Sequence, residues 1–162
     1  MVTLRQYGLQ YELRAEQVVR KNLLDVFDFF SKATNLEIIT PQFLNFRILN
    51  VSTPDVQEGT IINYSLKLYG IPFRWRTLIT NWVPPNRFTD IQIKGPYSLW
   101  KHDHFFVAID ENNTKVIDEV IFMIPFPRIS NLIVGKWVCG RVREIFEYRQ
   151  KVIDELMNRK KE

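Results

Sequence analysis

The two histidines of the chain stand two residues apart, at positions 102 and 104. Polar and apolar residues alternate around them, which is typical of a half-buried strand. Because successive side chains of a strand point to opposite faces, one face of this segment carries Trp100, His102, His104 and Phe106. Imidazole titrates near neutral pH and also ligates metal ions, which makes this face the first candidate for chemistry.

Carboxylate and amide side chains lie on the strands expected before and after the histidines. A hairpin through Gly95–Pro96 and a second short connection predict three cross-strand pairs: Gln92 with His102, Asp90 with His104, and Asp118 with Phe106. This pairing gathers Asp90, Gln92, His102, His104 and Asp118 on one patch of sheet. A shift of one residue would turn a whole strand over, so the shared face depends on the register.

Three interpretations of this patch remain open. Two imidazoles and a carboxylate are a donor set for zinc or iron, but the chain has no third histidine and we predict no metal. A histidine oriented by a carboxylate acts as a general acid or base, which makes His102, His104 and Asp118 the catalytic candidates. The third interpretation is a hydrogen-bond network that anchors the polar group of a ligand or braces the sheet, because buried polar groups need partners.

Other catalytic motifs are missing from the sequence. Cys139 is the only cysteine, and no neighbouring motif supplies the base or cation that a nucleophilic thiolate needs. The chain has neither a glycine-rich phosphate loop nor a G-x-S-x-G motif. We therefore predict no cofactor, and the sequence leaves open whether the protein is an enzyme.

The elements that position the patch are expected to form one α+β unit. A first strand is predicted at Tyr7–Ala15, where apolar residues recur at every second position. A short helix should begin after Asn22, which has the side chain of an N-cap, and a second helical piece is expected at Lys32–Ile39. That piece must end before Pro41, because the residue that precedes a proline is pushed out of the helical region.

Six further strands are expected, separated by turn residues: Phe46–Val51, Thr60–Leu68, Phe73–Val83, Arg87–Lys94, Leu99–Ile109 and Thr114–Ile124. Their short connections favour sequential antiparallel pairing, so with the first strand they predict a seven-stranded curved antiparallel sheet. After a loop at residues 125–130, one long amphipathic helix is expected to pack across this sheet. Its apolar side includes Val142, Phe146 and Ile153, and Arg149 is assigned to the polar remainder.

Composition limits the class of protein. The 162 residues are 46% hydrophobic and 25% charged, which is an ordinary globular mixture, and we expect one domain over residues 1–162. The net charge of +4 comes without a long basic run, so we predict no nucleic-acid partner. No signal peptide or membrane-spanning segment is recognisable, and a cytoplasmic location is the prediction. Aromatic residues make up 14% of the chain, which suits either a ligand cavity or an aromatic-rich core.

The chain also resembles a known superfamily. The residues that carry the resemblance are Pro41, Gly59–Ile62, Pro72–Trp75, Arg87–Gln92, Gly95–Phe106 and Ile145–Arg149. They are similar to the SRPBCC, or START-like, superfamily, and most similar to its polyketide cyclase/dehydrase-like and cell-division-inhibitor-like branches. The order of strand, two short helices, six strands and long helix is that of the helix-grip fold.

The resemblance implies a pocket between the sheet and the C-terminal helix that holds a hydrophobic small molecule such as a lipid, a quinone or a polyketide. The implied ligand-binding residues beyond the polar patch are Tyr64, Leu66, Trp75, Trp100, Phe106, Phe122 and Trp137, with Leu68, Phe73, Thr77 and Ile79 on the same strand faces. Plain core packing is the alternative for each of them. A cyclase or dehydratase that uses the histidines, and a protein-interaction module with a filled core, are the alternative functions. The protein is expected to be a monomer or a homodimer.

Overall fold

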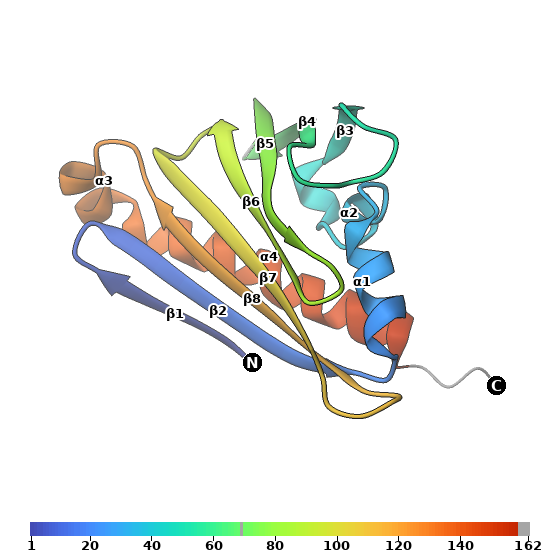
Figure 1. The fold of residues 1–162 in the computed structure, drawn as a ribbon. Coiled ribbons are helices and arrows are strands. Elements are labelled where there is room, and N and C mark those ends of the chain that lie inside the picture. The colour runs from blue at the N-terminus through green and yellow to red at the C-terminus, as the bar shows by residue number, and fades with distance from the viewer. Residues whose placement is uncertain (69, 159–162) are drawn as a thin grey trace.

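The computed structural model describes residues 1–68 and 70–158. Eight strands form one antiparallel sheet in the order β1-β2-β8-β7-β6-β5-β4-β3. Their bounds are β1 Val2–Tyr7, β2 Gln10–Val19, β3 Arg47–Val51, β4 Ile61–Leu68, β5 Ile71–Val83, β6 Arg87–Lys94, β7 Leu99–Ala108 and β8 Thr114–Met123. Figure 1 shows the sheet curving over the long helix α4, which crosses one of its faces. The six strands expected between residues 46 and 124 are confirmed to within two residues at each end.

The strand count is eight because a hairpin takes the place of the predicted first strand: β1 begins at Val2, and Tyr7–Ala15 covers its last residue, the turn and the first part of β2. Gly8 has a φ of 60° and forms a two-residue connection with Leu9, so that Tyr7 pairs with Gln10. A glycine at the first central position is what a type II′ hairpin turn requires. Alternation continues on both sides of such a turn, and for that reason the sequence pattern of Tyr7–Ala15 was indistinguishable from one continuous strand.

The helices follow the expected order with one addition. The α1 helix spans Leu23–Ser31, and the side chain of Asn22 caps it by accepting a hydrogen bond of 2.9 Å from the backbone N–H of Asp25. The second helical piece is shorter than predicted: α2 covers Asn35–Ile38, and a 3-10 turn, η1, follows at Gln42–Leu44. The α4 helix spans Gly135–Met157. The segment before it was predicted as a loop but contains a further helix, α3, at Pro127–Ile133.

Two hydrophobic clusters join α4 to the sheet at its two ends. Near its C-terminus, Ile153 and Met157 pack with Val26 and Phe27 of α1. Nearer its N-terminus, Val142 and Phe146 pack with Tyr11, Leu13 and Ala15 of β2 and with Val120 and Phe122 of β8. The stretch of α4 between these clusters faces the middle of the sheet, where space remains for a site.

The glycines near the start of α4 have different surroundings. A Cβ atom at Gly135 would lie 2.4 Å from the Tyr11 hydroxyl oxygen, so this position needs a glycine for the close approach of β2. Gly140 is exposed, and an added Cβ would meet nothing within 4 Å. Gly140 therefore neither opens space beneath the helix nor permits a close contact with the sheet. Among the described helices, none is long and apolar enough to cross a bilayer.

Candidate functional site

A cavity of about 170 Å³ lies between the sheet, the α1–α2–η1 segment and α4. Its walls are mainly apolar and are contributed by Phe30, Leu36, Ile39, Leu44, Phe46, Ile62, Tyr64, Leu66, Trp75, Ile79, Phe88, Tyr97, Trp100 and Phe146, among others. The polar side chains that line it include Thr77, Asp90, His102, His104 and Arg149. An apolar cavity with a few placed polar groups is the usual form of a small-molecule site.

Aromatic rings in mutual contact build the sheet side of the cavity. The Trp75 ring stacks on Tyr64 at 5.8 Å between centroids and meets Trp100 edge-on at 5.2 Å. Tyr97 lies against both tryptophans, at 5.6 Å from Trp75 and 4.9 Å from Trp100. The indole N–H of Trp75 donates a 3.1 Å hydrogen bond to the Thr77 hydroxyl. These contacts fix the ring planes, so the wall is held in one arrangement.

The strand register differs from the predicted one by two residues on each side of β7. Asp90, not Gln92, lies opposite His102, and Asp118 lies opposite His104 rather than Phe106. Gln92 stands beside the β6–β7 connection instead, where its amide donates a 2.6 Å hydrogen bond to the Tyr97 carbonyl oxygen. An even shift keeps every side chain on its expected face, so the polar residues still meet.

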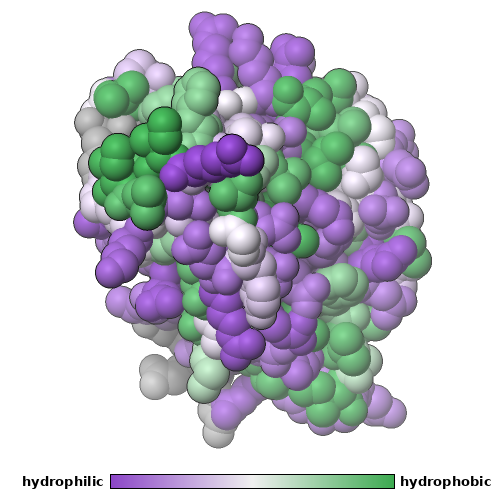
Figure 2. Space-filling model, turned by 90° about the vertical axis from the view of Figure 1, so that its left-hand side faces the viewer, coloured by the Kyte–Doolittle hydropathy of each residue, from purple (hydrophilic) through white to green (hydrophobic). Residues whose placement is uncertain are grey.

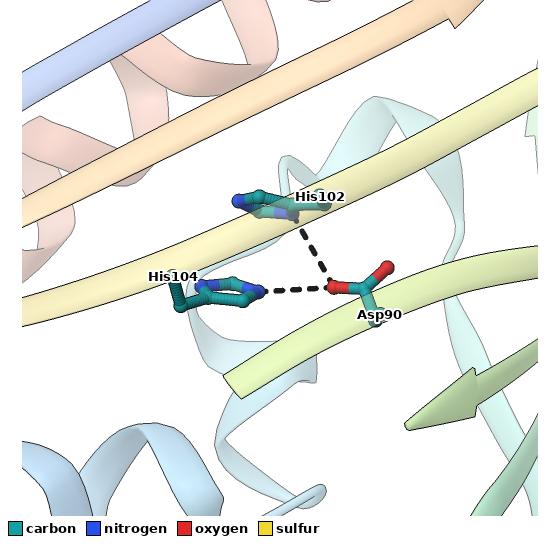
Figure 3. A group of neighbouring side chains, drawn as sticks. All are labelled: Asp90, His102 and His104. Atoms are coloured by element: carbon teal, nitrogen blue, oxygen red, sulfur yellow. Dashed lines mark hydrogen bonds and ion pairs between the residues drawn. The ribbon is translucent and has the colours of Figure 1, made fainter. Parts of the chain in front are cut away.

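Asp90, His102, His104 and Asp118 form a closed arrangement in which each carboxylate faces both imidazoles. The Nε2 atom of His102 lies 2.9 Å from Asp118 Oδ1, and its Nδ1 lies 3.4 Å from Asp90 Oδ2. The Nε2 atom of His104 lies 2.9 Å from that same Asp90 oxygen, and its Nδ1 lies 3.1 Å from Asp118 Oδ1. Figure 3 shows the two imidazole edges converging on the single Asp90 oxygen. The two rings lie 3.7 Å apart between centroids.

Arg149 adds a positive charge from α4. Its Nη1 atom lies 3.9 Å from Asp118 Oδ1, and its guanidinium carbon lies over the rings of Phe30 and Phe146 at 5.8 and 5.7 Å. The residue is only 9% exposed, and its Nε has no hydrogen-bond partner among the described residues. Arg149 thus lines the cavity and also carries a buried Nε donor without a described partner.

Burial and mutual contact shift the pKa values of the four central groups in different directions. Burial raises the pKa of Asp118, but Arg149 and the hydrogen bonds of both histidines outweigh it and hold that pKa well below its ordinary value. The pKa of Asp90 is lowered as well, because the histidines outweigh its burial. Burial and the neighbouring His104 lower the pKa of His102, whereas hydrogen bonds to the two carboxylates outweigh burial and raise that of His104. Protonation of one of the two histidines is enough to balance the charges of two carboxylates and one guanidinium.

Asp90, His102 and His104 also have the composition of a metal site, with donor atoms that all lie within 4.8 Å of one another. Their nitrogen atoms, however, face carboxylate oxygens at hydrogen-bond distance, and the Arg149 guanidinium lies next to the same cluster. These surroundings suit a shared-proton network better than an additional cation.

The structure places the predicted site residues in two groups. Those that line the cavity are Tyr64, Leu66, Trp75, Asp90, Trp100, His102 and His104, together with Thr77 and Ile79. Those outside the lining are Gln92, Phe106, Asp118, Phe122 and Trp137, as well as Phe73. The Leu68 side chain lies outside the described part of the chain.

The second group has other roles in the fold. Asp118 lies behind the histidines, which it contacts without lining the cavity. Phe106 and Phe122 are 1% and 0% exposed and belong to the two core clusters. Trp137 is 48% exposed and lies outside the cavity lining, so its position gives no support to the implied role in ligand binding.

The cavity lining also contains residues that the sequence analysis did not assign to a site, and Arg149 is the charged one next to the histidines. It was grouped with the polar side of the helix, although Val142, Phe146, Arg149 and Ile153 recur at spacings of four, three and four residues. Such spacings place four side chains on one helix face. The position of a charged residue within this apolar stripe could have indicated that Arg149 is buried against the sheet.

Comparisons with known proteins agree with this architecture. No family model matches the chain, and no curated protein matches it in sequence. Solved structures do match: a START superfamily protein from Mycobacterium smegmatis has a TM-score of 0.68 at 11% identity, over 91% of this chain and 97% of that one. The chain has the START-like helix-grip fold.

Two further helix-grip structures have names that mention an activity. The di-domain ARO/CYC StfQ from the steffimycin biosynthetic pathway has a TM-score of 0.72 at 11% identity, and the match covers 92% of this chain and 51% of that one. Norcoclaurine synthase from Thalictrum flavum, in complex with dopamine and hydroxybenzaldehyde, has a TM-score of 0.62 at 12% identity, over 99% of each chain. At these identities the likeness establishes the helix-grip fold alone.

Proposed function

We propose that residues 1–162 act as one domain that binds a hydrophobic small molecule in the cavity between the sheet and α4. The observation that carries this proposal is an apolar cavity whose wall includes a buried, charged His–Asp–Arg cluster. Burying charged groups is costly, and a protein that only needed a filled core would gain stability from apolar residues there. A ligand that contacts the cluster would explain why these charged groups are buried.

The size of the cavity favours a compact ligand. An apolar cavity of about 150 Å³ accommodates a benzene-sized molecule, whereas sites for drug-sized ligands occupy about 300–1,000 Å³. The cavity of about 170 Å³ therefore suits one aromatic ring with small substituents. Norcoclaurine synthase, on the same fold, holds two single-ring compounds, dopamine and hydroxybenzaldehyde. A lipid, quinone or polyketide fits only if the cavity widens.

The polar groups favour a ligand that accepts hydrogen bonds. Arg149 lines the cavity with a positively charged guanidinium, and the protonated form favoured at His104 adds positive charge. A carboxylate, phenolate or carbonyl oxygen can accept a hydrogen bond from a guanidinium, and a charge-assisted hydrogen bond is about twice as strong as a neutral one. The preferred ligand is therefore a small aromatic or alicyclic compound with an acidic or carbonyl group.

The first test uses protein purified from its host and analysed by native mass spectrometry, followed by extraction of any bound compound. Isothermal titration with 4-ethylbenzoate and with uncharged 4-ethyltoluene then tests the preference for an acidic group. Leu66→Trp fills the cavity from β4 and should abolish binding, while Leu49→Trp on the exposed side of β3 makes the same change outside the cavity and should retain it. Equal binding by both variants would refute the cavity as the ligand site.

Arg149→Met tests the polar contact without a large loss of volume. We expect it to weaken binding of 4-ethylbenzoate about tenfold to hundredfold while binding of 4-ethyltoluene changes little, since the lost interaction is charge-assisted. Arg143→Met makes the same substitution at an exposed position of α4 and should leave both affinities unchanged. Equal loss for the two compounds in Arg149→Met would contradict a specific contact with the acidic group.

An acid–base enzyme is the second candidate, because two adjacent histidines that line the cavity have pKa values displaced in opposite directions. Such a pair supplies one base and one acid at neutral pH. The test is conversion of the compound recovered from the protein: His102→Gln and His104→Gln should each abolish turnover and leave ligand binding intact. If the unaltered protein binds this compound without converting it, the enzyme is refuted and the binding function remains.

The proposal also covers partners, location and oligomeric state. We propose that the protein has no nucleic-acid partner, is located in the cytoplasm, and is a monomer or a homodimer. The interaction module with a filled core is disfavoured by the cavity, since a filled core would leave none.

A further inference from the structure

Five large hydrophobic side chains at and beside α3 project from the protein. Phe126 is 83% exposed, Ile129 64%, Leu132 88%, Ile133 76% and Trp137 48%. These five residues are called the α3 surface below. Figure 2 faces this end of the molecule and shows hydrophobic side chains gathered beside hydrophilic ones. A contiguous exposed apolar patch marks an interaction site, unlike single exposed apolar residues, which are normal.

The α3 helix is oriented with its uncharged polar side chains, Ser130 and Asn131, toward the protein. None of its residues is buried. Ser130 donates a hydrogen bond of 2.5 Å to the Pro125 carbonyl oxygen, and Asn131 donates one of 3.2 Å to the Leu9 carbonyl oxygen in the β1–β2 turn. The same turn exposes Leu9, which is 44% exposed, and so extends the α3 surface. The hydrogen bonds hold a short helix in place while its isoleucines and leucine face outward.

The charged residues of α3 and of the first two turns of α4 are all basic, although Arg141 pairs with Glu144 further along the helix. The sequence contains no acidic residue between Glu119 and Glu144, whereas Arg128, Lys136, Arg141 and Arg143 all lie in this interval. Arg128 and Lys136, next to the projecting side chains, are themselves exposed. A projecting apolar surface with a basic border complements the anionic surface and hydrocarbon interior of a lipid bilayer.

We propose that the α3 surface docks the protein onto anionic lipid bilayers. A second copy of the chain is a poorer occupant, because two such surfaces face to face would bring like charges together. A bilayer accepts projecting side chains without a matching groove, while its anionic headgroups neutralise Arg128 and Lys136. This docking does not depend on the ligand proposal, since none of the five residues of the α3 surface lines the cavity.

The test is flotation of the full chain with two kinds of vesicle: phosphatidylcholine alone, and equal parts of phosphatidylcholine and phosphatidylglycerol. We expect binding to the anionic vesicles that weakens at high salt, and much weaker binding to the neutral ones. The double variant Leu132→Ser/Ile133→Ser should lower the bound fraction about tenfold or more, because it removes two of the five large apolar side chains that enter the bilayer. Leu24→Ser, at a residue of α1 that is 69% exposed, is the matched control and should bind as the unaltered protein does.

The alternatives give different results. Absence of the unaltered protein from both vesicle fractions would overturn the proposal, as would equal loss of binding in Leu24→Ser. Analytical ultracentrifugation reports the other occupant: self-association that Leu132→Ser/Ile133→Ser abolishes, without vesicle binding, would assign the surface to a second copy. Circular dichroism shows that the variants are folded, and unchanged 4-ethylbenzoate binding by the double variant separates this proposal from that of the cavity.

Discussion

The cavity and the α3 surface depart from the usual distribution of side chains in opposite senses. Beside the cavity, two carboxylates, two histidines and an arginine are buried. At α3, four aliphatic and aromatic side chains are at least 64% exposed. Each arrangement is unfavourable for an isolated folded chain, because buried charges lose hydration and exposed apolar groups order water. The two regions differ in how they are held: the buried charges stabilise one another, whereas the exposed residues contact little.

That difference predicts unequal responses to mutation. Removing one member of the buried cluster leaves the other members as buried charges without a partner, so the free energy of unfolding should fall by a large amount. Removing Leu132 or Ile133, which are 88% and 76% exposed, should hardly change stability while binding to a partner is lost. A larger loss of stability from mutations in the α3 surface than from mutations in the buried cluster would contradict both assignments. The cluster would not be a mutually stabilising network, and the α3 surface would not be an interface.

Asp118→Ala should have the largest effect on stability. It leaves Arg149 and both histidines without the carboxylate that they share, and loss of one partner from a buried ion pair costs about 3–5 kcal/mol. Urea denaturation measures the loss. Asp28→Ala is the control, because Asp28 pairs with Lys32 on the surface and should contribute less than about 1 kcal/mol. Equal losses in the two variants would show that the cluster is not a mutually dependent network.

Gly135→Ala should have a smaller but still clear effect. The added Cβ would lie 2.4 Å from the hydroxyl oxygen of buried Tyr11, at the junction of α3 and α4, and overpacking of this kind costs about 1–3 kcal/mol. Gly140→Ala, five residues further along the same helix, meets nothing within 4 Å and should stabilise the protein by up to about 1 kcal/mol through helix propensity. Thermal denaturation of both variants should show shifts of opposite sign. A downward shift for both would mean that helix packing near α3 tolerates no side chain at either position.

The pH dependence of stability should separate the two histidines. The folded-state pKa of His104 is raised, so the folded state binds more protons and the contribution of His104 to stability is lost as pH rises through that pKa. The folded-state pKa of His102 is lowered, so its contribution to the slope has the opposite sign. In His102→Gln the free energy of unfolding should therefore fall as pH rises above about 6.5, whereas in His104→Gln, where His102 keeps its burial but loses the neighbouring His104, this fall should be smaller or reversed. Urea denaturation across neutral pH measures both slopes, and equal slopes would contradict the opposed shifts.

The sequence predicted most of the fold because local patterns determine most of it. Alternating polarity located six strands, Asn22 located the start of α1, and the recurring apolar positions located α4. The extra strand was missed because the turn at Gly8 reverses the chain direction without breaking the alternation of apolar and polar residues. The helix α3 was missed because its outward apolar residues do not form the buried stripe that identifies a helix in a sequence.

The site was predictable as a set of side chains but not as a geometry. Alternation placed Asp90, His102, His104 and Asp118 on one face, and an even shift in register preserved that result. Which carboxylate faces which histidine depends on the lengths of two connections, which a single sequence does not determine. Arg149 was missed because its charge was given more weight than its position in the apolar stripe. Charged residues buried for function contradict the pattern on which helix prediction relies.

The smallest effect on stability is expected at the α3 surface. Leu132→Ser should change the free energy of unfolding by no more than about 0.5 kcal/mol, because the side chain is 88% exposed and surface substitutions without buried contacts are nearly neutral. Phe146→Ala, at a residue 2% exposed between the core and the cavity, removes a comparable hydrophobic group from the interior and should cost about 3–5 kcal/mol. Urea denaturation compares them directly. If Leu132→Ser lowers the free energy of unfolding by more than about 1 kcal/mol, the Leu132 side chain stabilises the fold of the free protein. The exposure of α3 would then be no argument for binding to a bilayer.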